Sequence, residues 1–533
     1  MIFCIKTIMF ETTFPISLLT LFKKIVTIRK TAPIFFLLML FLFVEAQADS
    51  LSVLTLGARP DDTIDDTNSF RRALQSNASI IDVPKGRYIM GDLETYLPIR
   101  SRKEIVCDPE TVFLIPKHAK VSSTETRHGY IFRPVFGASI EDPPITNFSI
   151  SGCRFIIESP DVTPILIDKE NANHVLIEGV IIDGKGETLH NQAAYGILVN
   201  NGTDVTIRNT EISFTRGPAI VMRLPRKSLI EGNRIKFSGV DVAYTEKGPS
   251  LAEYKVDYWN SSGISFSGAS GCNIIGNRID WTGGAGIILR GGTANCENNT
   301  VASNILTNIG KGGIGIGINN EGGGSSLNNV IKDNVIKGYM QRWSDAGINI
   351  NHRGPRGEIQ NITISNNIID LFGPDASKYR FPTHYEFIKT YGAQIIIDPS
   401  ETGYADNITI SGNSFQNSIG PAVAAKRLRN SFIVDNSIGN SCRALSEGTH
   451  GLRKSECSPI VVKEALNIKV NSNKFLTKMK SVINISAQYS EVRNNLIFYC
   501  GQEDTVEETE SVSGTANTVT DNIMGGCKTA EPF

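Results

Sequence analysis

Ten short segments rich in Ile, Val and Gly each carry a polar residue four positions after a leading Gly or its replacement. The residue before it is apolar, so along a strand one set of side chains faces a core and the other faces outward. The predicted outward column comprises Asn200, Arg223, Ser267, Arg290, Asn319, Asn351, Asp398, Lys426, Lys463 and Ser486. Arg290, Asn319 and Asn351 could neutralise a ligand carboxylate, and Lys426 could exchange a proton. The alternative is that water alone keeps an outward column polar.

Further titratable and cationic residues stand next to this column. His352 directly follows Asn351 and precedes Arg353, where an imidazole could act as an acid or base. Arg427 follows Lys426 and would help to steer an anionic ligand. An incidental surface histidine is the alternative for His352. The predicted catalytic residues are Asp398, Lys426, His352 and Arg290.

Two long insertions, residues 240–260 and 371–392, precede strands of this column and are rich in tyrosine. Long loops on a rigid scaffold are where binding residues gather, and aromatic faces suit sugar rings. The predicted binding residues are Asn319, Asn351, Arg353, Arg427, Tyr244, Tyr258 and Tyr385. Packing of each loop onto the scaffold is the alternative for the tyrosines.

An Asn-x-apolar pattern repeats along the chain and predicts regularly stacked turns that would position these segments. It occurs at Asn233, Asn277, Asn304, Asn334, Asn367, Asn413, Asn436, Asn473, Asn495 and Asn522. The closest spacings are in the low twenties, which is typical of a parallel β-helix with short strands and no helices between them. Asn suits a stacked turn because it tolerates left-handed backbone and can hydrogen-bond its equivalent one coil away. The alternative is that Asn and Gly mark unrelated turns of an ordinary β-protein.

The start of the chain predicts a targeting segment and a cap. The apolar run 34–44 follows basic residues and precedes Ala46-Gln47-Ala48, the layout of a secretory signal with cleavage near Ala48. Residues 1–48 are therefore expected to be a signal peptide or an N-terminal anchor, and residues 49–533 the β-helix domain. An amphipathic helix over 62–75, capped by Asp65 or Asp66, would cover the N-terminal end of the core.

The cysteine count and the net charge bear on the compartment of the protein, on metal binding and on nucleic-acid binding. Eight cysteines follow the leader, which suits a disulfide-forming compartment, and Cys442–Cys457 and Cys500–Cys527 are expected as local bridges. No CxxC pair occurs, so no metal site is predicted. No cofactor is expected, and calcium is not indicated. The formal net charge of −1 argues against a nucleic-acid partner.

The segment LGARPDDTIDDTNSFRRAL resembles the opening motif of the pectate-lyase superfamily, and the Asn-x-Ile repeats are similar to that superfamily's coils. The resemblance covers roughly residues 51–525. It implies an all-β, single-stranded right-handed parallel β-helix with an N-terminal capping helix. The polygalacturonase signature is missing: Arg234-Ile235-Lys236 occurs without the preceding elements. The Tyr-Gly-Phe-Asp-Pro-His element of alginate epimerases is also absent.

Three functions remain open at this point. The first is an exported polysaccharide-processing enzyme, a lyase or epimerase for uronate-containing glycans. The second is a glycoside hydrolase that uses Asp398 with Asp345 or Asp370. The third is a non-catalytic glycan-binding or surface scaffold. A polysaccharide is the expected partner, secreted, periplasmic or cell-surface the expected location, and stable membrane association is not expected once the signal is removed.

Overall fold

The computed structural model of the protein describes a defined set of residues. These are 49–121, 124–127, 130–138, 142–160, 162–186, 192–240, 261–292, 294–317, 324–338, 346–352, 357–371, 393–399, 403–418, 420–442, 457–477, 481–499 and 510–526. Residues 1–48, where the signal or anchor is predicted, lie outside this set. Among the described residues no helix is long and apolar enough to cross a membrane.

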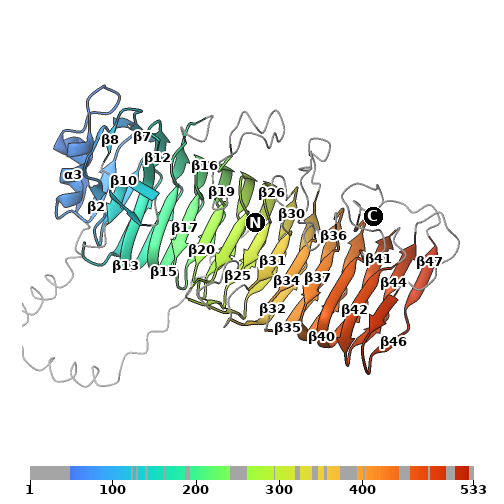
Figure 1. Ribbon diagram of the computed structural model, residues 1–533. Coiled ribbons are helices and arrows are strands. Elements are labelled where there is room, and N and C mark those ends of the chain that lie inside the picture. The colour runs from blue at the N-terminus through green and yellow to red at the C-terminus, as the bar shows by residue number, and fades with distance from the viewer. Residues whose placement is uncertain are drawn as a thin grey trace, which may run out of the picture. The chain divides into compact units, whose positions relative to one another are not determined.

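From Ser50 onward the chain winds as a right-handed parallel β-helix whose coils stack in chain order (Figure 1). A full coil contributes strands to three faces, named here face 1, face 2 and face 3 in chain order. The described strands of faces 1 and 2 form one sheet of 30 strands, because long strands such as β13 and β15 bend from one face to the next. Face 3 is a separate sheet of 15 strands.

Face 1 is made of parallel strands that pair from coil to coil. They are β5 (Leu97–Pro98), β10 (Tyr130–Ala138), the first parts of β13 (Val162–Glu178) and β15 (Ile197–Arg208), β17 (Ile220–Arg223), β20 (Ile264–Ser267), β23 (Ile287–Arg290), β27 (Ile314–Ile316), β31 (Ile348–Asn351), β34 (Ile395–Asp398), β37 (Val423–Lys426), the first part of β40 (Ile460–Asn471), β42 (Ile483–Gln488) and β45 (Glu510–Ser513). The short β9 (Thr124–Arg127) pairs antiparallel with β10.

Face 2 takes the second parts of β13, β15 and β40 together with shorter strands. These are β1 (Ser50–Ser52), β2 (Ile80–Val83), β6 (Glu104–Cys107), β11 (Thr146–Ser151), β18 (Leu229–Glu231), β21 (Asn273–Ile275), β24 (Cys296–Glu297), β25 (Thr300–Ala302), β28 (Ser326–Leu327), β29 (Val330–Lys332), β32 (Ile359–Ser365), β35 (Ala405–Ser411), β38 (Leu428–Val434), β43 (Glu491–Arg493) and β46 (Thr518–Thr520).

Face 3 is regular from one end of the coil to the other. Its strands are β3 (Gly86–Ile89), β7 (Thr111–Ile115), β12 (Arg154–Ile157), β14 (Ile181–Asp183), β16 (Glu211–Thr215), β19 (Arg234–Ser238), β22 (Arg278–Thr282), β26 (Ile305–Ile309), β30 (Val335–Lys337), β33 (Ile368–Asp370), β36 (Ser414–Gln416), β39 (Ser437–Gly439), β41 (Lys474–Thr477), β44 (Leu496–Tyr499) and β47 (Ile523–Gly526). β4 (Asp92–Leu93) pairs with β8 (Lys120–Val121) in a separate two-stranded sheet.

The predicted asparagine column is confirmed as a hydrogen-bonded ladder at the corner between faces 2 and 3. Asn277 Nδ2 donates to Asn304 Oδ1 at 3.0 Å, and Asn304 Nδ2 donates to Asn334 Oδ1 at 2.9 Å. The same link recurs along the ladder from Asn233 to Asn522. The members from Asn233 to Asn495 are buried, so the ladder satisfies polar groups that water cannot reach.

Left-handed backbone was expected at these asparagines, but it occurs one residue earlier in the chain. The left-handed residues are the ones immediately before them, such as Gly232 (φ 63°), Gly276 (φ 65°) and Asp333 (φ 57°). The left-handed residue turns the chain, and the following asparagine directs its amide along the stack.

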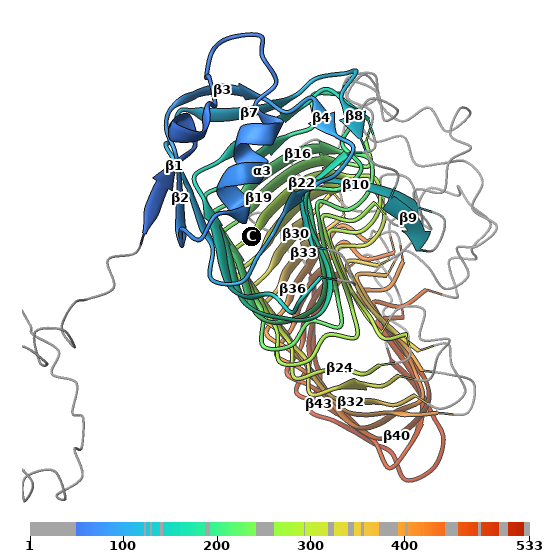
Figure 2. The same ribbon diagram turned by 90° about the vertical axis from the view of Figure 1, so that its left-hand side faces the viewer.

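The predicted capping helix is α3 (Thr67–Gln75), which lies across the N-terminal end of the coils (Figure 2). Phe70, Ala73 and Leu74 of this helix are buried, as expected. It starts later than predicted because the acidic turn binds neighbouring coils instead: Asp66 accepts hydrogen bonds from the backbone N–H groups of Arg59 and Ile89. Burial raises the pKa of Asp66, which those two hydrogen bonds partly oppose. A short 3-10 helix, η1 (Val53–Leu56), precedes it.

Two disulfides join described cysteines. Cys442–Cys457 was predicted and is confirmed, whereas Cys107–Cys153, which links the ends of β6 and β11 on adjacent coils, was not expected. Cys500 and Cys527 lie outside the described residues. Cys272 and Cys296 are buried free thiols, and burial raises their pKa values to about 11 and about 12. Both remain protonated, and therefore unreactive, near neutral pH.

Candidate functional site

The strand register of face 1 assembles most of the predicted outward column. Asn200 pairs with Arg223, Arg223 with Ser267, and Ser267 with Arg290. Further along, Asn351 pairs with Asp398 and Lys426 with Lys463. The column also extends by one coil toward the N-terminus, because Asp168 pairs with Asn200 and accepts a hydrogen bond from its amide.

One coil departs from the predicted column. Leu289 pairs with Ile316, and Gly317 donates its N–H to Leu289 O at 2.8 Å, so Gly317 takes the position expected for Asn319. Gly313, rather than Gly315, is the leading glycine of this coil. A Cβ at Gly313 would lie 2.5 Å from Gly347 O, so only glycine fits there. Asn319 itself lies outside the described residues.

A notch opens in the N-terminal half of the column, over β15, β17, β20 and β23. Its volume is about 100 Å³, and the lining residues are Tyr195, Leu198, Pro218, Val221, Met222, Arg223, Ser265, Ser267 and Arg290. Arg223 and Arg290 are two coils apart, which corresponds to about 10 Å. None of the described lining residues is acidic, so the notch is a cationic site.

The floor of the notch is apolar and carries an aromatic ring. Leu198 is buried on the outer side of face 1, with Tyr195 and Val221 packed against it. The Tyr195 ring has room because residue 217 is glycine: a Cβ there would lie 2.6 Å from Tyr195 Cε1. An apolar floor between two guanidinium groups can take one face of a sugar while its carboxylate is bound.

The C-terminal half of the column is different in charge and exposure. Asn351 is buried, whereas Asp398 is exposed on the next coil. Lys426 Nζ and Arg427 Nε lie 3.8 Å and 2.9 Å from the two carboxylate oxygens of Glu464. Hydrogen bonding from Arg427 lowers the pKa of Glu464, so this carboxylate stays ionised and offsets part of the local positive charge.

The structure does not support His352 as an exposed acid or base. Its side chain is 2 % exposed, and Nε2 lies 3.0 Å from Gly324 O. A Cβ at Gly357 would overlap the imidazole ring, so the ring is tightly enclosed. His352 therefore belongs to the packing of this corner. Its sequence position beside Asn351 gave no sign of burial.

The predicted catalytic residues are spread along the coil. Asp398 lies three coils from Arg290 and Lys426 four, or about 14 Å and about 19 Å. A single sugar residue spans about one coil, so Arg290 cannot act on the same bond as Asp398 or Lys426, which lie on adjacent coils. Asp370 belongs to face 3, and its Oδ1 accepts a hydrogen bond from Asn417, so it does not pair with Asp398 along face 1.

Other predicted residues cannot be placed. Arg353, Tyr244, Tyr258 and Tyr385 lie outside the described residues, as do Asp345 and most of both insertions. Within the described part of the chain, no group of three or more His, Cys, Asp or Glu side chains could hold a metal ion.

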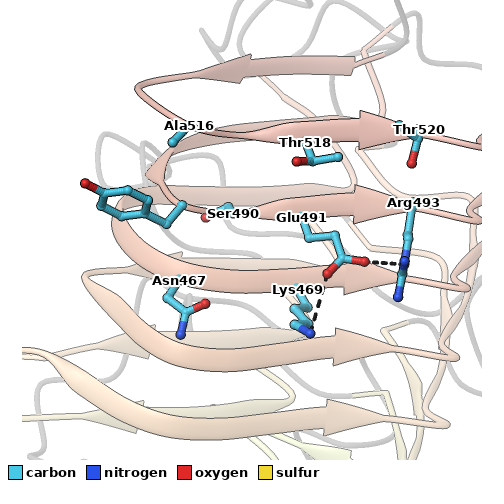
Figure 3. Close-up of a pocket in the computed structure, with 9 residues that line it drawn as sticks. Asn467, Lys469, Ser490, Glu491, Arg493, Ala516, Thr518 and Thr520 are labelled. Atoms are coloured by element: carbon cyan, nitrogen blue, oxygen red, sulfur yellow. Dashed lines mark ion pairs between the residues drawn. The ribbon is translucent and has the colours of Figure 1, made fainter.

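A separate pocket lies on face 2 near the C-terminal end, between β40, β43 and β46 (Figure 3). Glu491 lies between Lys469, at 3.5 Å, and Arg493, with which it forms a second ion pair (Figure 3). Glu491 offsets part of the positive charge of Lys469 and Arg493, so the pocket should attract an anionic ligand less strongly than the notch on face 1.

The sequence did not indicate the residues of the notch as a site. Arg223 and Ser267 belong to the predicted column but are not among the predicted site residues. Tyr195, which immediately precedes the leading Gly196 of its segment, lies outside the predicted column. The available signal was the pair of arginines in alternate coils, with no acidic residue between them in the column.

Comparison with known proteins supports the fold. Residues 169–369 match the family model described as the right handed beta helix region, in agreement with the right-handed β-helix fold of the chain. No curated protein sequence matches the chain significantly.

Three solved structures illustrate the similarity. The catalytic unit of an alpha-1,3-glucanase from Streptomyces thermodiastaticus is 12 % identical, with 89 % of this chain and 70 % of that chain covered and a TM-score of 0.40. PfbA, a surface adhesin of Streptococcus pneumoniae, is 14 % identical, with 88 % and 91 % covered and a TM-score of 0.42. A Family 28 exopolygalacturonase of Yersinia enterocolitica is 11 % identical, with 92 % and 80 % covered and a TM-score of 0.42.

Proposed function

We propose that the protein binds a uronate-containing polysaccharide along face 1 and processes it as a lyase or epimerase. The observation that carries the proposal is the notch, where Arg223 and Arg290 flank an apolar floor and no described lining residue is acidic. Coil spacing is about 4.8 Å, close to the length of one sugar residue, so successive sugars can follow the column.

The chemistry begins with the carboxylate of one uronate in the notch. Arg223 and Arg290 neutralise it, which lowers the barrier to removing the proton from the adjacent ring carbon. Tyr195 is the one described lining residue, apart from the arginines, that can exchange a proton. Its phenolate is the group we assign to take this proton, in place of His352, Lys426 and Asp398. In a lyase the glycosidic C–O bond then breaks, and the phenol so formed returns the proton to the departing oxygen.

A second candidate is binding without turnover. It is favoured by one observation: the described lining of the notch contains no carboxylate, histidine or lysine. The hydrolase alternative has less support, because Asp398 and Asp370 lie on different faces and Asp345 is outside the described residues.

The test is incubation of the protein with uronate and neutral glycans, read by ultraviolet absorbance, reducing ends and sugar composition. A lyase releases unsaturated, absorbing sugars, and an epimerase changes the uronate composition without cleavage. New saturated reducing ends would show hydrolysis and overturn the proposal. Saturable uronate binding without any product would establish the second candidate.

We further propose that residues 1–48 direct export and that the folded domain acts outside the cytoplasm, with cleavage near Ala48. N-terminal sequencing of the protein recovered from the extracellular fraction would reveal a start near Asp49. Recovery of the chain only inside the cell would contradict export.

A further inference from the structure

Face 3 carries a groove that the predicted site does not include. It has a volume of about 480 Å³ and runs over five consecutive strands, from β12 to β22. Its lining residues are Arg154, Ile181, Ile182, Asp183, Glu211, Ile212, Ser213, Arg234, Ile235, Lys236, Arg278 and Asp280. The volume is within the range of pockets that bind small ligands, and four coil intervals span about 19 Å.

Three aromatic residues on consecutive coils are the next residues in sequence after residues that line this groove. Phe214, Phe237 and Trp281 directly follow the lining residues Ser213, Lys236 and Asp280, which pair with one another across face 3. Each side chain is partly exposed. The Phe214 and Phe237 rings are stacked, with centroids 5.1 Å apart, and Lys236 Nζ lies 4.7 Å from the centroid of Phe237.

The backbone at these positions is unfavourable for aromatic residues. Phe214, Phe237 and Trp281 all have positive φ, at 58°, 57° and 56°. This conformation costs about 1–2 kcal/mol for residues other than Gly and, to a lesser degree, Asn and Asp. At the same corner of other coils the chain uses residues that tolerate it, namely Asn308, Gly338, Asn417 and Asn440. Residues retained against local preference are a reason to look for function.

The charges of the groove are mixed, unlike those of the notch on face 1. Four basic and three acidic side chains line it. Arg234 lies 3.4 Å from Glu211, and Asp280 accepts hydrogen bonds from Thr307 at 2.8 Å and from Asn308 at 2.9 Å. Alternating donors and acceptors suit the hydroxyl groups of a sugar, whereas the near balance of charge gives no attraction for a polyanion.

We propose that the groove of face 3 is a second glycan site, which binds a neutral polysaccharide segment. Phe214, Phe237 and Trp281 form an aromatic ledge against which apolar sugar faces pack. Ser213, Lys236 and Asp280 then hydrogen-bond the hydroxyls of successive sugars. This site is distinct from the notch in position, since it lies on another sheet, and in the charge of its ligand.

The experiment measures binding of neutral glucose hexasaccharides, β-1,4-, β-1,3- and α-1,4-linked, and of hexagalacturonate to the full chain by calorimetry. The key variant is Phe237→Asn/Trp281→Asn, because asparagine is the residue that other coils use in this conformation. We expect this variant to unfold at the same temperature as the wild type or higher. Its association constant for the neutral ligand should fall about tenfold, from the loss of two aromatic contacts.

Two further variants keep the result interpretable. Lys236→Ala changes an exposed side chain of the groove and should also weaken binding of the neutral hexasaccharide. It tests the proposal if the double variant does not fold. Arg223→Ala should leave neutral binding unchanged, which separates this site from the notch. The proposal is overturned if no neutral hexasaccharide binds saturably, if both groove variants bind like the wild type, or if their loss is confined to hexagalacturonate.

Discussion

Two lines of polar residues run along the same coils: the corner between faces 2 and 3, and the outward column of face 1. Residue identity is constant from coil to coil in the first and changes in the second. At the corner, asparagine recurs from Asn233 to Asn522, and each amide donates to the side-chain oxygen of the next asparagine along the ladder. On face 1 the residue changes from arginine to serine, glycine, asparagine, aspartate and lysine. The corner is buried, and much of the column is partly or fully exposed.

This difference separates residues that hold the coil from residues free to bind ligands. A buried amide needs hydrogen-bond partners on the neighbouring coils, so the same residue is required on each successive coil. The polar group of an outward side chain can hydrogen-bond to water, so its residue type can change from coil to coil. Local departures from neighbouring coils, such as the paired arginines of the notch or the aromatic ledge of face 3, are therefore where function is to be sought.

The largest effect is expected from breaking the ladder with Asn334→Ala. Asn334 Oδ1 accepts from the N–H and amide of Asn304, and its Nδ2 donates to Val301 O and Asn367 Oδ1 at 2.9 Å. Several buried groups would lose partners, so we expect destabilisation on the order of 3 kcal/mol or more. Denaturant unfolding measures it.

Asn328→Gly is the matched control for the ladder. Asn328 is exposed, hydrogen-bonds Asn298 and Asn361, and has a φ of 54° that glycine adopts easily. We expect a change within about 0.5 kcal/mol. Equal destabilisation by the two variants would contradict the distinction between a buried asparagine of the ladder and an exposed asparagine.

Tyr195→Phe tests the proton-transfer role in the notch. The ring and the apolar floor are kept and only the phenol oxygen is lost. Turnover on the uronate substrate should fall about 100-fold, as expected for loss of general acid–base catalysis, while binding changes little. Steady-state kinetics with a parallel binding measurement decides this, and wild-type turnover in the variant would remove Tyr195 from the mechanism.

Arg223→Ala should weaken binding of an oligouronate by about tenfold or more, because a charge-assisted hydrogen bond to the ligand is lost. Its unfolding midpoint should not change. Lys463→Ala, an exposed cation on the same column, is the matched control and should have little effect. Raising the salt concentration should reduce the difference between Arg223→Ala and the wild type. Equal losses in both variants would indicate a diffuse charge effect rather than a site.

The ion pair between Asp406 and Arg429 on face 2 should make a small contribution to stability that depends on pH. Asp406 Oδ2 lies 2.8 Å from Arg429, whose hydrogen bond lowers the pKa of Asp406 in the folded protein. Its stabilisation is present above the unfolded pKa of about 3.9 and is lost as the pH falls through the folded pKa. Asp406→Asn should cost less than about 1 kcal/mol at pH 7, because the pair is partly exposed, and nothing in strong acid. Unfolding curves across this range would show whether the two proteins converge.

Asp398→Asn should have the smallest effect. The side chain is exposed, so the isosteric change creates no cavity and should alter stability by no more than about 0.5 kcal/mol. Because Asp398 is about 14 Å from Arg290, turnover should stay within about twofold of the wild type. A large loss of turnover would restore Asp398 as a catalytic residue and move the reaction away from the notch.

Several features of the fold were predictable because they depend on local pattern. The Asn-x-apolar spacing predicted the ladder, the Asp-rich turn predicted α3, and the short separation of Cys442 and Cys457 suggested their bridge. Cys107–Cys153 was missed because its 46-residue separation is bridged only by stacking one coil on the next. The phase of GIGIGINN was misjudged because a shift of two residues leaves every side chain on the same face. Close packing of Gly313 against Gly347 selects the register.

The coil, the ladder and the outward direction of the column follow from the amino-acid pattern, because periodicity and burial act on neighbouring residues and repeat in every turn. Which outward residues meet depends instead on how the coils stack. Stacking placed Tyr195 beside Arg223 and Arg290, enclosed His352, and paired Arg427 with Glu464. It also aligned Phe214, Phe237 and Trp281 beside one groove. Juxtapositions such as those of Arg223 with Arg290 and of Arg427 with Glu464 join coils that insertions separate in sequence, so the repeat spacing alone does not predict them.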